Sequence, residues 1–144
     1  MGIPKAVAWQ APRLVPVVLA TNAAVLTAPD TAAFISDARY ELVRVDSCQS
    51  TAGTGGAATL DIKKASGTTA PASGTSMLTT TFNLENTANT VVSKTISNGG
   101  LSTTQSTRQI ASGDRICLDF TGTLTSLTGV CVTLWLKPLS RPSY

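Results

Sequence analysis

Apolar and polar residues alternate along several short segments of the chain, and this alternation predicts β-strands. Because successive side chains of a strand point to opposite faces, one face of each such strand is predicted to lie in a core. Segments 58–63 and 116–120 alternate in this way, and segments 40–48 and 91–96 are β-branched and partly alternating. In the clearest segment, every second residue is a branched aliphatic: Val130, Val132, Leu134 and Leu136.

Other segments have weaker patterns. Residues 14–20 indicate a first strand, in which Pro16 favours an edge position or a bulge. Residues 107–110 indicate one more strand, and residues 30–35 a short helix capped by Asp30. The apolar spacing of 76–84 matches one or two helical turns, but its three threonines lower helix propensity, so that segment stays open.

Turn and loop residues separate these segments at intervals typical of a β-sandwich. Glycine-bearing turns occur at 54–56, 98–100 and 112–114, where Gly113 is available for positive φ, and 66–74 has a loop composition. We therefore predict an all-β jelly-roll or β-sandwich fold of about eight antiparallel strands.

The last two strands are predicted to pair as a hairpin centred near Leu124, which would place Cys117 opposite Cys131. With Cys48 they make three cysteines, an odd number without a CxxC pair, so neither a disulfide framework nor a zinc site is indicated. We expect free thiols that act as small hydrophobic residues, with an oxidised Cys117–Cys131 pair outside the cell as the alternative.

Both ends of the sequence lack strand or helix periodicity and contain proline. We predict an N-terminal arm at 1–13, a jelly-roll body at 14–137 and a C-terminal arm at 138–144. The arms carry apolar residues that a solvated tail lacks, so we expect them to dock on neighbouring subunits, with disordered ends as the alternative. The predicted partner-interface residues are Ile3, Pro4, Lys5, Val7, Trp9, Arg13, Trp135, Leu139, Arg141 and Tyr144.

The charge distribution supports a role for these arms. Only 13% of residues are charged against 42% hydrophobic, so part of the surface is expected to be covered by partners. The ends hold four basic residues and no acidic ones, whereas the middle holds the other seven basic residues against eight acidic ones. Because basic residues do not cluster with aromatic ones, we predict no nucleic-acid binding.

The sequence indicates no catalytic or cofactor chemistry. Without histidine, Ser-His-Asp and Cys-His systems are excluded. Asp114 is interpreted as the cap of its own turn, and it shares no catalytic surface with Asp119. The glycine pairs lack phosphate-loop and dinucleotide spacing, and no calcium-loop pattern occurs. We expect neither metal nor cofactor, and Trp135 is interpreted as a sheet-face residue or as an interface anchor.

No membrane association is predicted. The longest apolar stretch, 14–26, is interrupted by Pro16, Thr21 and Asn22 and is shorter than the ~20 residues of a membrane-spanning helix. Prolines in the first 16 residues also interrupt the apolar segment that a signal peptide requires.

A resemblance to a known family is carried by the stretches 67–71, 73–79, 82–84 with 87–91, 111–116 and 129–133. Through these stretches, residues 40–137 resemble a family of small phage virion proteins. Some of these are jelly-roll decoration, or cement, proteins that sit on icosahedral heads, often as trimers, and the resemblance supplies no catalytic residues. The turn at 113–116, Gly-Asp-Arg-Ile, is also similar to that of trimeric jelly rolls of the tumour-necrosis-factor type.

The resemblance implies a capsid decoration protein that binds the outer surface of a phage head and stabilises contacts between major capsid subunits. The expected partners are the major capsid protein and further copies of the chain in a homotrimer, assembled in the host cytoplasm and carried on the virion. The alternative is a tail-fibre or receptor- or glycan-binding jelly-roll module. An enzyme, such as a small polysaccharide lyase or hydrolase, is disfavoured by the missing histidine.

Overall fold

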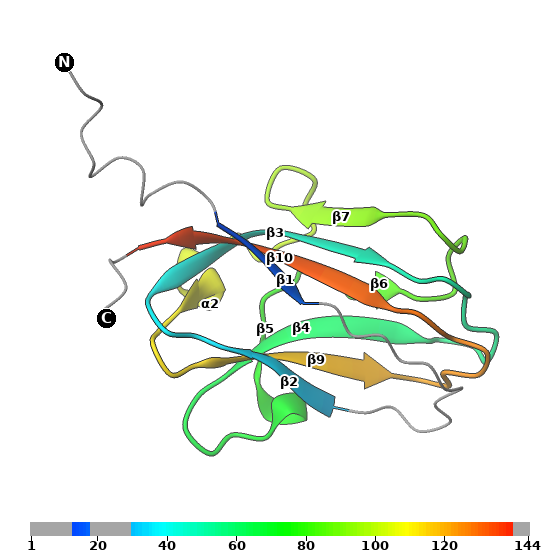
Figure 1. Cartoon of the computed structure of the whole chain (residues 1–144), viewed down its shortest axis with the longest axis horizontal. Helices are drawn as coiled ribbons and strands as arrows, with labels where there is room; N and C mark the ends of the chain where they lie inside the picture. Colours follow the sequence, from blue (N-terminus) through cyan, green and yellow to red (C-terminus); the bar gives the residue numbers. More distant parts are fainter. Residues whose placement is uncertain (1–12, 18–29, 140–144) are drawn as a thin grey trace.

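Two antiparallel β-sheets pack face to face in the computed structural model, which describes residues 13–17 and 30–139 (Figure 1). Sheet A has the strand order β1-β10-β3-β7, with β8 also paired to β3. Sheet B has the order β2-β9-β4-β5, with β6 also paired to β4. The strands of sheet A are β1 (Arg13–Val17), β10 (Cys131–Pro138), β3 (Tyr40–Cys48), β7 (Val92–Thr95) and β8 (Gln109–Ile110). Those of sheet B are β2 (Asp30–Ile35), β9 (Arg115–Thr121), β4 (Thr59–Ala65), β5 (Thr75–Ser76) and β6 (Phe82–Asn83).

The chain crosses repeatedly from one sheet to the other. Strands β5 and β6 both pair with β4, and strands β7 and β8 both pair with β3. If each of these two sets is counted as one interrupted strand, the sandwich has eight strands. Each sheet then holds four strands, and only the step from β4 to β5 stays within one sheet. This order is compatible with a jelly roll, and the predicted all-β sandwich of about eight antiparallel strands is confirmed.

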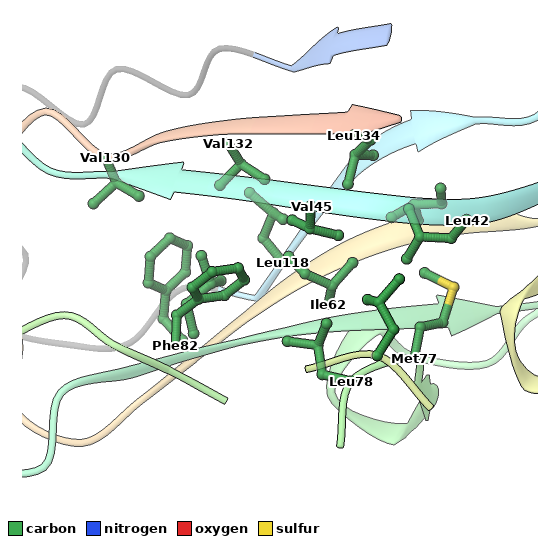
Figure 2. Close-up of a cluster of buried hydrophobic side chains, with 14 of the residues drawn as sticks. Leu42, Val45, Ile62, Met77, Leu78, Phe82, Leu118, Val130, Val132 and Leu134 are labelled. Carbon is green, nitrogen blue, oxygen red and sulfur yellow. The ribbon is translucent and has the colours of Figure 1, made fainter. Parts of the chain in front are cut away.

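The core lies between the two sheets. Along β10 the burial alternates as the sequence pattern predicts, with Val132 and Leu134 fully buried. Figure 2 shows these two side chains and Val45 of β3 pointing toward Ile62 of β4 and Leu118 of β9. Each such side chain contributes ~1.5–3 kcal/mol to folding when it leaves water, so this layer is the main source of stability.

Several predicted strands are confirmed with small changes in their bounds. The segment 40–48 is strand β3, 58–63 corresponds to β4, 91–96 to β7 and 116–120 to β9. The first strand, predicted at 14–20, corresponds to β1, which begins one residue earlier, at Arg13, and is an edge strand as Pro16 indicated; residues 18–20 lie outside the described part. The turn at 112–114 is also confirmed, with φ of 86° at Gly113.

The predicted helix at 30–35 is wrong, because these residues form strand β2. Thr31 pairs with Leu118, and Phe34 pairs with Ile116 across a bulge. Pairing with β9 supplies backbone hydrogen bonds along the whole segment, and this tertiary gain outweighs the weak local preference for a helix.

Two further segments differ from the interpretation of the sequence. Residues 76–84 form no helical turn: they contain the last residue of β5 and the whole of β6, and an isolated bridge joins Leu78 to Leu101. Their apolar residues, Met77 and Phe82 among them, are buried in the core, which explains their irregular spacing. Residues 107–110, predicted as a strand, are divided between the helical turn α2 (Gln105–Arg108) and β8. A second short helix, η1 (Pro71–Ser73), lies within the predicted loop 66–74.

The predicted hairpin of the last two strands is also wrong. Strand β9 belongs to sheet B and β10 to sheet A, so Cys117 does not face Cys131. The connection between them crosses the core, where Leu124 and Leu127 are buried. A sandwich core is ~10 Å thick, and nine residues span it easily once their apolar side chains anchor the crossing.

Candidate functional site

Both predicted arms join the sandwich at the same end of sheet A. Because β1 is antiparallel to β10, its first residue, Arg13, lies opposite Leu136, near the place where β10 ends (Figure 1). Strand β10 continues one residue past the predicted body, to Pro138, and the amide of Leu139 then donates to the carbonyl of Arg39 at 2.8 Å. We call this end of the molecule the arm end and define it by Arg13, Leu139 and the loops 36–39 and 111–114.

The two loops of the arm end are tied to each other by backbone hydrogen bonds. Ser36 N–H donates to the carbonyl of Asp114 at 2.8 Å, and Gly113 N–H donates to the carbonyl of Ser36 at 2.7 Å. Tyr40 Oη donates to Asp37 Oδ1 at 2.7 Å. These bonds join the β2–β3 loop to the β8–β9 loop, so the arm end is a preorganised surface.

Charged and apolar side chains are both exposed around the arm end. Ile35, the last residue of β2, is 69% exposed, although isolated exposed isoleucines are common on protein surfaces. Arg39 and Lys137 are exposed as well. Asp114 caps its own turn as predicted, because its Oδ2 accepts from Ala111 N–H at 2.8 Å.

Trp135, a predicted interface anchor, lies half-buried on the outer face of sheet A. Its Nε1 donates to Asp46 Oδ2 at 2.9 Å, and the Arg44 guanidinium lies 5.2 Å from the ring centroid. Arg44 Nε and Ser93 Oγ also donate to Asp46, at 2.7 and 2.6 Å. Burial alone would raise the pKa of Asp46, but these three hydrogen bonds outweigh it and hold the pKa below the ordinary 3.8.

The outer face of sheet B carries a row of carboxylates that the sequence did not indicate. Asp30, Asp119 and Asp61 are register partners on three adjacent strands, β2, β9 and β4. Lys63 Nζ lies 2.5 Å from Asp119 Oδ2, and Ser76 Oγ donates to Asp61 Oδ1 at 2.7 Å. Asp119 is thus paired with a cation and Asp61 accepts from a hydroxyl, and the positive charge of Lys63 limits the repulsion within the row.

Two carboxyls of this row, Asp30 and Asp61, have raised pKa values. Hydrogen bonding with Asp119 raises the pKa of Asp30, and burial raises the pKa of Asp61. Hydrogen bonding with Asp119 also raises the pKa of Lys63, which therefore stays charged. Within residues 30–139, no group of three or more cysteine, aspartate or glutamate side chains is arranged to hold a metal ion.

A buried ion pair, also not foreseen, joins α2 to β3. Arg108 Nη1 lies 2.5 Å from Glu41 Oε1 and also donates to the carbonyl of Leu42 at 3.3 Å. Gln105 Nε2 donates to Glu41 Oε2 at 3.4 Å. The two charged residues lie 67 positions apart, so no local pattern indicates the contact. Its role is structural, because it fixes the short helix to the sheet.

The structure places only some of the predicted interface residues. Trp135 and Leu139 lie in or next to β10, and Arg13 begins β1. The remaining predicted interface residues lie outside the described part of the chain: Ile3, Pro4, Lys5, Val7, Trp9, Arg141 and Tyr144. For every predicted interface residue, placed by the structure or not, contact with a partner remains a prediction.

No pocket is found in the described part of the chain. Among the described residues, no helix is long and apolar enough to cross a membrane. Comparisons of the chain with protein-family models, with curated proteins and with solved structures gave no match.

Proposed function

We propose that the protein is a structural component of a phage particle, a decoration protein that binds the outer surface of the head and stabilises contacts between major capsid subunits. The supporting observation is that residues 13 and 139, which adjoin the two arms, lie at the same end of sheet A. Two proline-bearing segments from opposite ends of the sequence therefore start from one preorganised surface and can reach the same neighbouring subunit.

The proposed mechanism is mechanical. The sandwich acts as a rigid body, and the two arms lie across joints between shell subunits. A joint then opens only when the arm contacts are lost as well. Several weak contacts on one rigid body strengthen binding through effective concentration, and a trimer would multiply them further. The basic residues of both arms would favour an acidic shell surface.

Removal of residues 1–12 tests this proposal, because the truncated chain keeps the whole of β1. We expect it to fold with an unchanged circular dichroism spectrum, to bind less to particles and to give particles of lower heat resistance. A chain that lacks residues 140–144 tests the second arm in the same way. Full retention on particles of unchanged heat resistance in both variants would contradict arm-mediated stabilisation.

Electron cryomicroscopy of particles that contain the protein separates this proposal from the tail-fibre alternative. Density for the sandwich on the shell, with the arm end toward capsid subunits, is the expected result. Density at the tail tip would contradict the proposal. Sedimentation equilibrium of the purified full-length chain tests the expected homotrimer.

A further inference from the structure

Two of the three cysteines lie directly opposite each other on the central strands of sheet A. Cys48 ends β3, Cys131 begins β10, and the two residues are register partners in this antiparallel pair. Both side chains are partly exposed, and both thiols are free in the structure. The sequence had suggested Cys117 as the partner of Cys131, but Cys117 lies in the other sheet.

Contacts along the same strands show that the two cysteines share the outer face of sheet A. Arg44 is the register partner of Trp135, and its guanidinium lies over the Trp135 ring. The register continues without a bulge from this pair to Cys48 and Cys131. Cys48 lies four residues after Arg44 in β3, and Cys131 lies four residues before Trp135 in β10. Because every second residue of a strand points to the same side, the two thiols lie on the face that carries Trp135.

Their backbone separation suits a disulfide bond. Opposite residues in an antiparallel pair have Cα atoms ~4.5 or ~5.5 Å apart. Disulfides span Cα distances of ~4.4–6.8 Å. The strands are held together on both sides of the cysteines: Ser47 pairs with Val132 on one side, and Thr51 forms a bridge with Thr128 on the other.

We propose that Cys48 and Cys131 form an oxidisable pair that closes an intramolecular disulfide between β3 and β10. A low-molecular-weight disulfide is the oxidant. The thiolate of one cysteine attacks a sulfur of that disulfide, which gives a mixed disulfide and releases one small thiol. The thiolate of the second cysteine then displaces the other small thiol. Two protein thiols are thus oxidised to one disulfide, and the small disulfide is reduced to two thiols.

Cys117 provides a matched control in the same molecule. It is buried in β9, where its register partners are Ala32 of β2 and Lys63 of β4. Burial raises the pKa of its thiol, so less of the reactive thiolate forms. Cys117 therefore has neither a cysteine partner across the sheet nor access to the oxidant.

The disulfide would add stability by restricting the unfolded chain. It would close the long loop from residue 48 to residue 131, and long loops lose the most conformational entropy when they are closed. A chain that folds in a reducing compartment and later meets an oxidising one would gain this stability after folding. The inference rests on the strand register and on the partial exposure of both thiols, and it does not depend on the proposed function.

The test treats the folded full-length protein with oxidised glutathione, traps the remaining thiols with an alkylating reagent and counts them in denaturant. We expect the three free thiols to fall to one in each monomer, with a mass loss of two hydrogen atoms and a peptide that links Cys48 to Cys131. The melting temperature should rise by at least ~5 °C. Cys117→Ser should keep this rise, whereas Cys48→Ser and Cys131→Ser should abolish it.

Three results would overturn the proposal. The first is a thiol count that stays at three in the folded protein. The second is a linked peptide that contains Cys117, and the third is a disulfide that joins two chains. Circular dichroism of each variant before oxidation verifies that it is folded. Should a serine variant not fold, the linked-peptide map of the wild-type protein decides the question without it.

Discussion

Gly122 occupies a position where a side chain is excluded for two reasons. Its φ is 86°, in the left-handed region that favours glycine, and an added Cβ would lie 2.1 Å from the carbonyl oxygen of Ala57. Gly56 has almost the same φ, 85°, but no atom would lie within 4 Å of an added Cβ. The two glycines thus separate the cost of the backbone conformation from the cost of close packing.

We predict that Gly56→Ala lowers the free energy of unfolding by ~1–2 kcal/mol, the cost of a left-handed conformation. Gly122→Ala should cost ~1–3 kcal/mol more, because the loop that contains Ala57 must move away from the new methyl group. Urea denaturation of both variants measures the difference. Equal losses would show that the contact with Ala57 relaxes freely.

The stability of the fold should depend on pH through Asp61. Burial raises the pKa of this carboxyl in the folded state above its ordinary 3.8, so the ionised form weakens the fold. The contribution of Asp61 to the free energy of unfolding therefore increases as the pH falls through the folded-state pKa of Asp61 toward 3.8. The neighbouring charges are Asp119, Asp30 and Lys63. We predict that the melting temperature of wild type rises relative to that of Asp61→Asn between pH ~7 and ~4.

Asp46 supplies a control of opposite sign. Its folded-state pKa lies below the ordinary 3.8, so its contribution to stability is present above 3.8 and is lost as the pH falls through the folded-state pKa. The advantage of wild type over Asp46→Asn should therefore shrink below pH ~4. If both variants follow wild type in parallel across this range, neither carboxyl contributes to the pH dependence.

Strand β7 lies at one edge of sheet A, and the turn that follows β7 in the sequence covers this edge. Asn98 Nδ2 donates to the carbonyl of Ser93 at 2.9 Å, and Asn98 Oδ1 accepts from Thr95 N–H at 2.9 Å. The carbonyl of Thr95 accepts from Gly100 N–H at 2.9 Å. One carboxamide thus takes the place of a neighbouring strand, which blocks pairing with another chain at this edge.

We predict that Asn98→Ala lowers the free energy of unfolding by ~1–3 kcal/mol, since it removes side-chain hydrogen bonds worth ~0.5–1.5 kcal/mol each. The variant should also associate more strongly than wild type in sedimentation velocity, because the edge of β7 is open. Ser97→Ala, which removes a hydroxyl that is hydrogen-bonded to Thr95 Oγ1, is the matched control. Identical sedimentation of all three proteins would contradict the role of Asn98.

The strands with strong alternation were predictable because one of their faces is buried and the other is not. Strand β10 is the clearest case, since its pattern follows directly from its position over the core. The turn at 112–114 was predictable for a local reason, the freedom of Gly113 and the capping carboxylate of Asp114. In both elements the sequence signal is carried by residues that lie within a few positions of one another.

The other elements depend on partners that are distant in the sequence. Residues 30–35 form the strand β2 because β9, which begins more than eighty residues after the start of β2, pairs with them. The separation of β9 and β10 into different sheets depends on the loop that crosses the core, and sequence adjacency suggested the opposite. The pairing of Cys48 with Cys131 and the contact of Glu41 with Arg108 follow from that topology, so the sequence pattern did not contain them.

The arm end is the surface most directly tied to the proposed function. Lys137 is exposed there, next to the start of the C-terminal arm. We predict that Lys137→Gln weakens binding to particles and reduces the loss of binding on addition of salt, because one attraction to an acidic shell is removed. Lys137→Arg, which keeps the charge, should bind like wild type. Equal binding of the Gln and Arg variants at low salt would show that this charge does not contribute.

The central position of β10 in sheet A has a consequence for synthesis of the protein in the cell. Strand β10 lies between β1 and β3, and it is the last described strand that the ribosome makes. A nascent chain therefore holds β1 without a partner among the described strands until residues 131–138 emerge. Sheet A closes only after translation reaches them, so a prematurely terminated chain cannot present the surface that both predicted arms adjoin.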